Sequence, residues 1–321
     1  MCTAISCRGQ GCLFGRNLDI DASYGEEVVI TPKNFRFPLK NGGEYRTRYR
    51  LMGMAVVMEG RPAYYEAMND RGLAMAALNF PESAVYHPYQ PGMDNIALCE
   101  LLPWVLGQAE NLAQAKALLE RLNICNPEGL PTAPQHFMLG DRTGTLVAEP
   151  VAEGLKLYDN PFNVMTNEPP FPYHMWNLRN YRNLTREPGE NRFSRSYALD
   201  SYGVGMGSLG LPGDASSASR FVRAAFNLEN SVWGEEKKQR ISQFFHVLDS
   251  VAMLPGPVLT KVRRVDLTTC SCCMDLEDRV YYYTTWGNRR ITAVPMDLAQ
   301  PGEERLVRVP LRMEEDFCTE R

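Results

Sequence analysis

The sequence lacks the features that mark membrane-spanning, secreted and nucleic-acid-binding proteins. None of its apolar runs approaches the roughly 20 residues that a membrane-spanning helix requires. The opening MCTAISCRGQ has no basic stretch followed by an apolar segment, as a secretory signal would. With a formal charge of −4, there is no basic excess to favour nucleic acid or an anionic membrane surface. We therefore expect a cytoplasmic protein that binds neither nucleic acid nor membranes.

The cysteines lack the regular spacing of a disulfide framework. There are nine of them, at positions 2, 7, 12, 99, 125, 270, 272, 273 and 318, and this pattern favours reduced thiols. The cluster CSCC at Cys270–Cys273 lacks a second cysteine pair or a nearby histidine pair, so a packed strand is favoured there over a zinc site. The glycine-rich stretch Gly203–Gly210 lacks the Lys-Ser/Thr ending of a phosphate-binding loop, and we predict a flexible loop.

The chain also lacks internal repeats, low-complexity tracts and linkers that would divide its 321 residues. Short apolar runs predict strands at Cys2–Ser6, Cys12–Phe14, Glu27–Thr31, Leu51–Met58, Gly72–Leu78, His136–Gly140, Thr145–Glu149, Gly154–Tyr158, Arg279–Thr285 and Arg290–Pro295. Helical spacing predicts helices from about Asn95 to Gly107, Leu112 to Leu122, Ser217 to Phe226 and Arg240 to Met253. Residues 167–217 are interpreted largely as loop. The pattern predicts one α+β domain, residues 1–321, in which helices cover packed sheets.

Cys2 stands directly behind the initiator methionine. If Met1 is removed, one residue holds both a thiol, with a pKa of about 8.5, and an α-amine, with a pKa of about 7.7–8.0. That pair can act as nucleophile and general base. From this dipeptide alone, a buried structural cysteine is the favoured interpretation.

Arg16 and Asp19 follow one short strand later, in FGRNLD. A guanidinium near the thiol would favour the thiolate, and a carboxylate could hold the amine in place. On spacing alone, a functionally silent surface ion pair is the stronger interpretation.

Six blocks of sequence together resemble the choloylglycine hydrolase family. They are MCTAISC, FGRNLDI, VVITPKNF, ALNFP, VMTNEPPFPYH and GLPGDASSASRFVRAAF, and the likeness runs in order from Cys2 to about Trp286. Members of this family, the bile salt hydrolases and penicillin V acylases, are N-terminal nucleophile hydrolases. The resemblance implies a four-layer αββα sandwich.

The resemblance also implies roles for six residues. Cys2 matches the nucleophile, and Arg16 and Asp19 match the pair that tunes and orients it. Asn79 matches an oxyanion-hole donor, Asn167 a polar anchor beside the reacting amide, and Arg220 a distal active-site arginine. From the residues alone, Asn79 and Asn167 would be turn residues and Arg220 a helix residue paired with a carboxylate.

The implied reaction is hydrolysis of an amide through a thioester on Cys2, and it needs no metal or organic cofactor. The implied substrates are bile acids joined to glycine or taurine. Loops at Arg61–Tyr65 and Phe80–Tyr89 would form the walls of the pocket that binds them. The alternatives are a penicillin V acylase and a non-catalytic steroid- or lipid-binding protein.

The family likeness further implies a homotetramer. The stretch from about Phe171 to Tyr202 would reach a neighbouring subunit, with Tyr173, Trp176 and Tyr181 as aromatic anchors. The alternative is a loop folded back on its own core.

Overall fold

The first sheet carries the N-terminus of the chain near its centre. The computed structural model describes residues 1–7, 9, 11–126 and 133–320. Within these residues, six antiparallel strands form this sheet. In spatial order they are β14 (Val164–Met165), β1 (Cys2–Cys7), β2 (Leu13–Ile20), β15 (Leu267–Asp275), β16 (Val280–Thr285) and β17 (Thr292–Pro295).

The second sheet is larger and is also antiparallel throughout its described strands. In spatial order these are β13 (Gly154–Asp159), β12 (Gly144–Val151), β11 (Gln135–Asp141), β8 (Ala74–Asn79), β7 (Arg61–Asn69), β6 (Leu51–Met58), β3 (Glu27–Thr31) and β18 (Val307–Pro310). Two short pairs flank it, β4 (Arg36–Pro38) with β5 (Glu44–Arg46) and β9 (Asp94–Ala97) with β10 (Leu122–Cys125).

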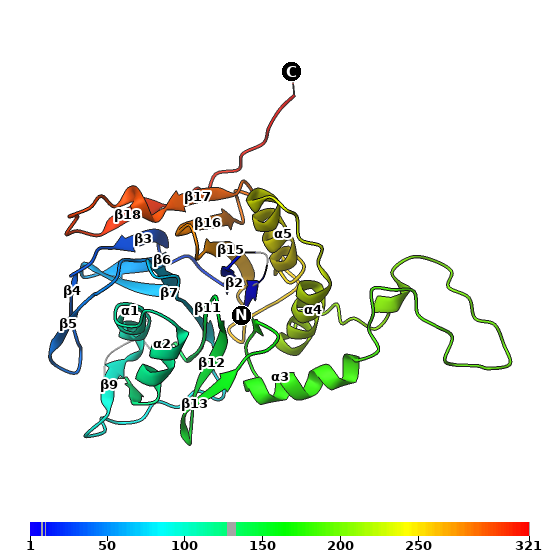
Figure 1. Ribbon diagram of the computed structural model, residues 1–321, viewed down its shortest axis with the longest axis horizontal. Helices are drawn as coiled ribbons and strands as arrows, with labels where there is room; N and C mark the ends of the chain where they lie inside the picture. The colour runs from blue at the N-terminus through cyan, green and yellow to red at the C-terminus, as the bar shows by residue number, and fades with distance from the viewer. Residues whose placement is uncertain (8, 10, 127–132, 321) are drawn as a thin grey trace.

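Helices cover both outer faces of the two packed sheets (Figure 1). On the first sheet lie α4 (Ser217–Asn230) and α5 (Lys237–Asp249); on the second lie α1 (Leu101–Leu106) and α2 (Leu112–Leu119). The remaining helical segments are α3 (Phe171–Asn177), η1 (Leu98–Glu100), η2 (Leu178–Tyr181), η3 (Met206–Ser208) and η4 (Met296–Leu298). The order of layers is helix, sheet, sheet, helix, as the family resemblance implied.

Alternation along the strands divides the apolar side chains between two cores. In β8, Ala76 and Leu78 pack between the sheets, whereas Met75 and Ala77 pack toward α1. Because successive side chains of a strand point to opposite faces, one strand serves both cores. β8 is therefore buried on both faces and forms a rigid support for the residue at its end, Asn79.

Several predicted elements are confirmed with small shifts at their ends. The strand behind Cys12 is longer than predicted, since β2 extends to Ile20, and the CSCC cluster lies in β15, as predicted. The predicted strand at Arg279–Thr285 is β16, and its alternation buries the rings of Tyr281 and Tyr283 in the core. Asn111 caps α2 by accepting a hydrogen bond from the Gln114 amide, 3.0 Å away.

Other predictions were wrong because long-range pairing overrides local periodicity. The predicted helix from Asn95 begins as strand β9, and Leu122, predicted to be helical, lies in β10. These two segments pair with each other in parallel, which no local pattern reveals.

The stretch interpreted as loop at Arg61–Tyr65 also needs correction, because it belongs to β7. Residues 167–217 are largely loop, as predicted, but they contain α3, η2 and η3. α3 has a proline in its first turn, where the missing N–H costs nothing.

None of the helices in the described part of the chain has the length and apolar character needed to cross a lipid bilayer. Within that same part, no three His, Cys, Asp or Glu side chains are grouped as metal ligands would be.

Candidate active site

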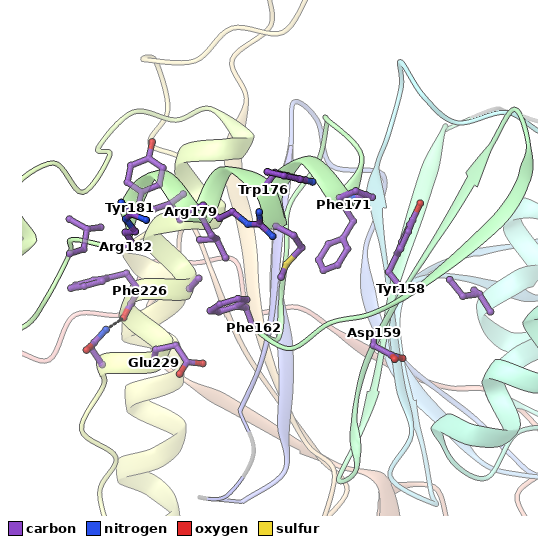
Figure 2. A pocket seen from close by; sticks show the side chains of 18 residues that line it. Tyr158, Asp159, Phe162, Phe171, Trp176, Arg179, Tyr181, Arg182, Phe226 and Glu229 are labelled. Carbon is purple, nitrogen blue, oxygen red and sulfur yellow. Dashed lines mark hydrogen bonds between the residues drawn. The ribbon is translucent and has the colours of Figure 1, made fainter.

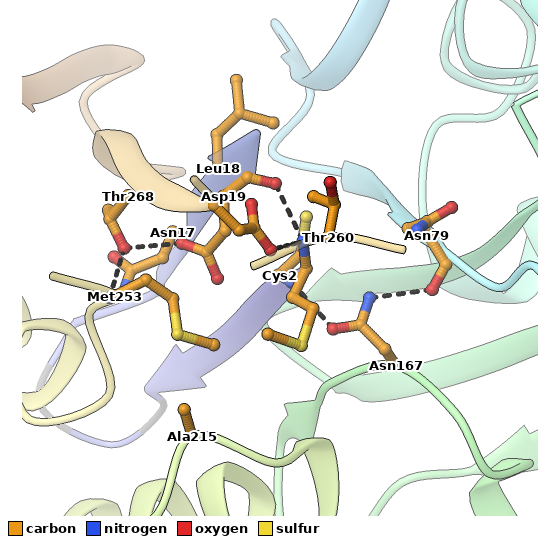
Figure 3. Close-up of polar contacts among 12 residues, drawn as sticks. Cys2, Asn17, Leu18, Asp19, Asn79, Asn167, Ala215, Met253, Thr260 and Thr268 are labelled. Carbon is orange, nitrogen blue, oxygen red and sulfur yellow. Dashed lines mark hydrogen bonds and ion pairs between the residues drawn. The ribbon is translucent and has the colours of Figure 1, made fainter. Parts of the chain in front are cut away.

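Cys2 begins β1 and is buried between the two sheets, with 4% of its surface exposed. It pairs across the strand with Leu18 of β2. Its backbone N–H donates to the Asn167 side-chain oxygen at 2.7 Å, a contact visible in Figure 3. Its sulfur accepts a hydrogen bond from the Arg16 guanidinium. Both the thiol and the nitrogen of one residue therefore have a fixed polar partner.

The Arg16 guanidinium lies in the interior, on the side of Cys2 that faces the second sheet. It is 1% exposed and donates to the carbonyl oxygen of Ala77 as well as to the Cys2 sulfur. Its Nε lies 3.8 Å from a carboxylate oxygen of Glu66. Burial opposes the charge of Arg16, but attraction from the Cys2 sulfur and from Glu66 outweighs it, and the pKa of Arg16 is raised. A permanent cation beside the sulfur favours the thiolate.

A second buried arginine approaches Cys2 from α4. One nitrogen of Arg220 donates to the Cys2 carbonyl oxygen at 2.5 Å and to the Thr3 hydroxyl at 2.6 Å. Another donates to the Asn167 side-chain oxygen at 2.8 Å. Burial lowers the pKa of Arg220, against the attraction of Asp19. Asn167 and Arg220 thus hold the backbone of Cys2 from the side opposite to Arg16.

Asp19 lies at the other end of the same cluster. One of its carboxylate oxygens accepts from the Thr268 hydroxyl at 2.6 Å; the other is buried and has no hydrogen-bond partner among the described residues. Burial raises the pKa of Asp19, although the charge of Arg220 opposes this. The backbone of Asp19 pairs with Met1, whose ammonium also contacts Asp266 at 2.9 Å.

Asn79 reaches the cluster through its backbone. Its carbonyl oxygen accepts from the Asn167 side-chain nitrogen at 2.8 Å, so the two asparagines that the sequence singled out lie side by side (Figure 3). Asn79 is exposed at the end of β8, where its carboxamide can donate to an oxygen outside the protein.

The structure brings Cys2, Arg16, Asn79, Asn167 and Arg220 into one connected network and places Asp19 beside it. Two β-bulges flank this network, at Tyr65 in β7 and at Thr269 in β15. Bulges re-aim side chains next to active sites. Here they precede Glu66, which faces Arg16, and follow Thr268, which binds Asp19.

Sequence reasoning missed several buried polar residues that support this network. Glu66, Thr268 and Asp266 contact Arg16, Asp19 and Met1, respectively. His136 and His174 donate to the carbonyl oxygens of Thr166 and Asn167. Four of them stand within a strand or helix of ordinary composition and Asp266 directly precedes β15, so only the folded arrangement reveals their contacts.

A large apolar groove lies away from Cys2. It has a volume of about 920 Å³ and is lined by residues of β13, α3, η2 and α4, including Phe162, Trp176 and Phe226. Figure 2 shows these rings gathered beside α3. Because the groove contains none of the six predicted site residues, its size alone does not connect it with their chemistry.

Comparisons with known proteins cover nearly the whole chain. A family model described as linear amide C–N hydrolases, choloylglycine hydrolase family, matches residues 2–301. A bile salt hydrolase/transferase from Lactiplantibacillus plantarum is 41% identical over 320 residues, 99% of each chain. A conjugated bile acid hydrolase from Lactobacillus gasseri is 35% identical over 314 residues, 96% of this chain and 99% of the other.

Solved structures show the same architecture. A mutant of the conjugated bile acid hydrolase from Clostridium perfringens matches with a TM-score of 0.92, at 32% identity and 100% coverage of both chains. Penicillin V acylase from Agrobacterium tumefaciens matches with a TM-score of 0.73, covering 92% of this chain and 86% of the other. At 18% identity, this second likeness concerns the fold alone.

Proposed function

Since the chain belongs to the choloylglycine hydrolase family of linear amide C–N hydrolases, we propose that it hydrolyses the amide bond of bile acids conjugated to glycine or taurine. One observation carries this proposal: the thiol and the backbone nitrogen of Cys2 each contact a fixed polar group, Arg16 and Asn167. The names of the relatives at 41% and 35% identity support the substrate class.

We assign Cys2 as the nucleophile, with its own α-amine as general base once Met1 is removed. Arg16 stabilises the thiolate, and Asp19 provides a negative charge beside the N-terminus. Asn167 and Arg220 orient the Cys2 nitrogen and carbonyl. Asn79 donates to the carbonyl oxygen of the substrate. No metal or organic cofactor takes part in this scheme.

The first half of the reaction forms a thioester. The Cys2 sulfur attacks the amide carbon and forms a C–S bond, while the thiol proton passes to the α-amine. The negative charge that develops on the carbonyl oxygen is stabilised by Asn79; one fixed donor at such a position contributes about 2.7–4 kcal/mol. The α-amine then gives its proton to the leaving nitrogen as the C–N bond breaks, and glycine or taurine departs.

Water completes the cycle. The α-amine takes a proton from the water, whose oxygen attacks the thioester carbon. A second tetrahedral oxyanion forms in the same position and collapses. The C–S bond breaks, the bile acid leaves, and the proton returns to the Cys2 sulfur.

The test compares three substrates on one preparation. Glycocholate, taurocholate and penicillin V are each incubated with the protein and with its Cys2→Ala variant, and the released amine is measured. We expect release from the two bile salts, reduced at least about a thousandfold in the variant. The small change should leave the melting temperature nearly unaltered. Release from penicillin V alone would favour the acylase alternative, and release from none would favour a steroid- or lipid-binding protein.

We further propose that residues 1–321 act as one cytoplasmic domain and assemble as a homotetramer. The segment between η2 and α4 supports the assembly, because it extends away from the two sheets (Figure 1). It exposes Phe193, Tyr197 and Tyr202, which are 92%, 70% and 86% exposed. Aromatic residues of this kind are enriched in interfaces.

A further inference from the structure

Glu66 is a fully buried acidic residue that touches the site through Arg16. It is 1% exposed and lies in β7, directly after the bulge at Tyr65. One carboxylate oxygen accepts from the Tyr281 hydroxyl at 2.6 Å. Within the described part of the chain, the other oxygen has no hydrogen-bond partner, and it lies 3.8 Å from the Arg16 Nε.

The Arg16 guanidinium therefore stands between two groups that compete for its charge. Its far end donates to the Cys2 sulfur, while its Nε donates to the Asn17 carbonyl oxygen at 3.3 Å and lies 3.8 Å from the Glu66 carboxylate. The carbonyl oxygens of Ala77 and Tyr65 fix the plane of the guanidinium between them. A cation shared with a carboxylate stabilises a thiolate less than a cation that faces the thiolate alone.

We propose that Glu66 is a positioning residue that acts through Arg16: its carboxylate takes up part of the guanidinium charge and so sets the pH at which the Cys2 thiol becomes the reactive thiolate. Tyr281 holds the carboxylate in this position. The inference rests on the proposed role of Cys2 as the nucleophile.

The other charged and titratable groups around Cys2 come from every element packed against it. They are Asp19 of β2, Tyr65 of β7, Arg220 of α4, Asp266 before β15, Cys270, Cys272 and Tyr281 of the first sheet, and the Met1 ammonium. Burial raises the pKa of Glu66, whereas the charge of Arg16 and the hydrogen bond from Tyr281 act in the opposite direction.

The experiment measures how fast iodoacetamide alkylates Cys2 as a function of pH in the processed protein. Mass spectrometry identifies the modified peptide, because Cys99 and Cys318 are exposed and react as well. In Glu66→Gln, an amide of the same size replaces the carboxylate. We expect the midpoint of the alkylation profile to fall by about one pH unit. The acid limb of the kcat/KM profile for glycocholate should move in the same direction.

Two controls separate this effect from a general disturbance. Glu66→Asp keeps the charge, and its midpoint should stay close to that of the wild type. Glu100→Gln makes the same chemical change at another buried carboxylate, which accepts from the Lys40 amide at 2.8 Å beside α1, away from Arg16. It should leave the profile unchanged.

An unchanged or raised midpoint in Glu66→Gln would overturn the inference. If that variant does not fold, Tyr281→Phe replaces it. A smaller fall in the midpoint of the alkylation profile supports the inference, and an unchanged midpoint overturns it. The alkylation profile is measured without substrate. Hydrolysis that survives in Cys2→Ala would instead refute the proposed function, so the two failures are distinguishable.

Discussion

At the scale of single residues, two buried histidines bind the successive backbone carbonyls of Thr166 and Asn167. His136 donates to the Thr166 carbonyl at 2.9 Å and contacts Glu149 at 3.0 Å through its other nitrogen. His174 donates to the Asn167 carbonyl at 3.0 Å, and its second nitrogen is buried with no hydrogen-bond partner in the part of the chain that the structure describes. Since Asn167 contacts the Cys2 nitrogen, the state of His174 bears on the geometry of the site.

His174 makes the folded protein sensitive to acid. Burial lowers its pKa to about 4, from an ordinary value of 6.5. Between these values the unfolded chain binds a proton that the folded chain does not. The contribution of His174 to the free energy of unfolding is therefore fully present above about pH 6.5. It is lost as the pH drops toward about 4, by up to about 3 kcal/mol.

His174→Gln should reduce this loss, because glutamine keeps a donor for Asn167 but does not titrate. Denaturant unfolding at pH 5 and pH 7 measures the difference in free energy of unfolding. His246→Gln, which changes an exposed histidine, is the matched control and should keep the wild-type pH dependence. Equal acid sensitivity in all three proteins would contradict the assignment of this sensitivity to His174.

The sequence could identify the residues of the site only where they stand in distinctive blocks. Cys2, Arg16, Asp19, Asn79, Asn167 and Arg220 were found through such blocks, and the fold brings them together. Glu66 stands in the strand sequence YYEAMN, where an acidic residue normally points to solvent. Its burial depends on the bulge at Tyr65 and on a tyrosine more than two hundred positions away, neither of which a local pattern contains.

At the scale of elements, β2 and β15 approach each other closely at one glycine. A side-chain carbon added to Gly15 would lie 1.9 Å from the Cys272 carbonyl oxygen. This contact lies in the middle of the pairing that aligns Arg16 with Cys272 and Asp19 with Thr268. β2, which carries Arg16 and Asp19, therefore pairs with β15 in this way because residue 15 has no side chain.

Gly15→Ala should push the two strands apart. We expect a loss of at least about 3 kcal/mol in the free energy of unfolding, since backbone atoms cannot move aside as a flexible side chain can. Gly189→Ala is the control, because an added carbon there meets nothing within 4 Å. Urea titration of both variants would show the difference; similar midpoints would argue against the close approach.

Elements defined by their own residues were predicted well, and elements defined by distant partners were not. α4, with its strongly one-sided apolar face, and β3, with its run of β-branched residues, needed no tertiary information. β9 and β10 exist because they pair with each other across the α1–α2 region. In α3, the prolines that suggested a loop instead begin the helix.

At the scale of the whole molecule, the projecting segment (residues 185–207) departs from the four layers. Its ends are joined by a hydrogen bond of 2.9 Å from the Thr185 amide to the Gly207 carbonyl. Between them lie Phe193, Tyr197, Tyr202 and the fully exposed Val204. The segment is therefore closed at its base and presents exposed apolar side chains beyond it.

Replacing Phe193, Tyr197 and Tyr202 together by serine should abolish assembly without unfolding the subunit. Sedimentation velocity should then detect monomers in place of tetramers, while the melting curve of the subunit stays cooperative. The matched control changes Val232, Leu254 and Phe317 to serine, since these are similarly exposed apolar residues elsewhere. A wild-type protein that sediments as a monomer would refute the assembly itself.

The contacts of Met1 limit when this residue can be removed. Its carbonyl and its ammonium pair with the backbone of Asp19, and the ammonium also binds Asp266, so the folded sheet holds the residue whose removal the proposed function requires. An aminopeptidase needs a loose chain end. We therefore expect Met1 to be removed while the nascent chain is still emerging from the ribosome. A molecule that folds first would keep Met1 and stay inactive.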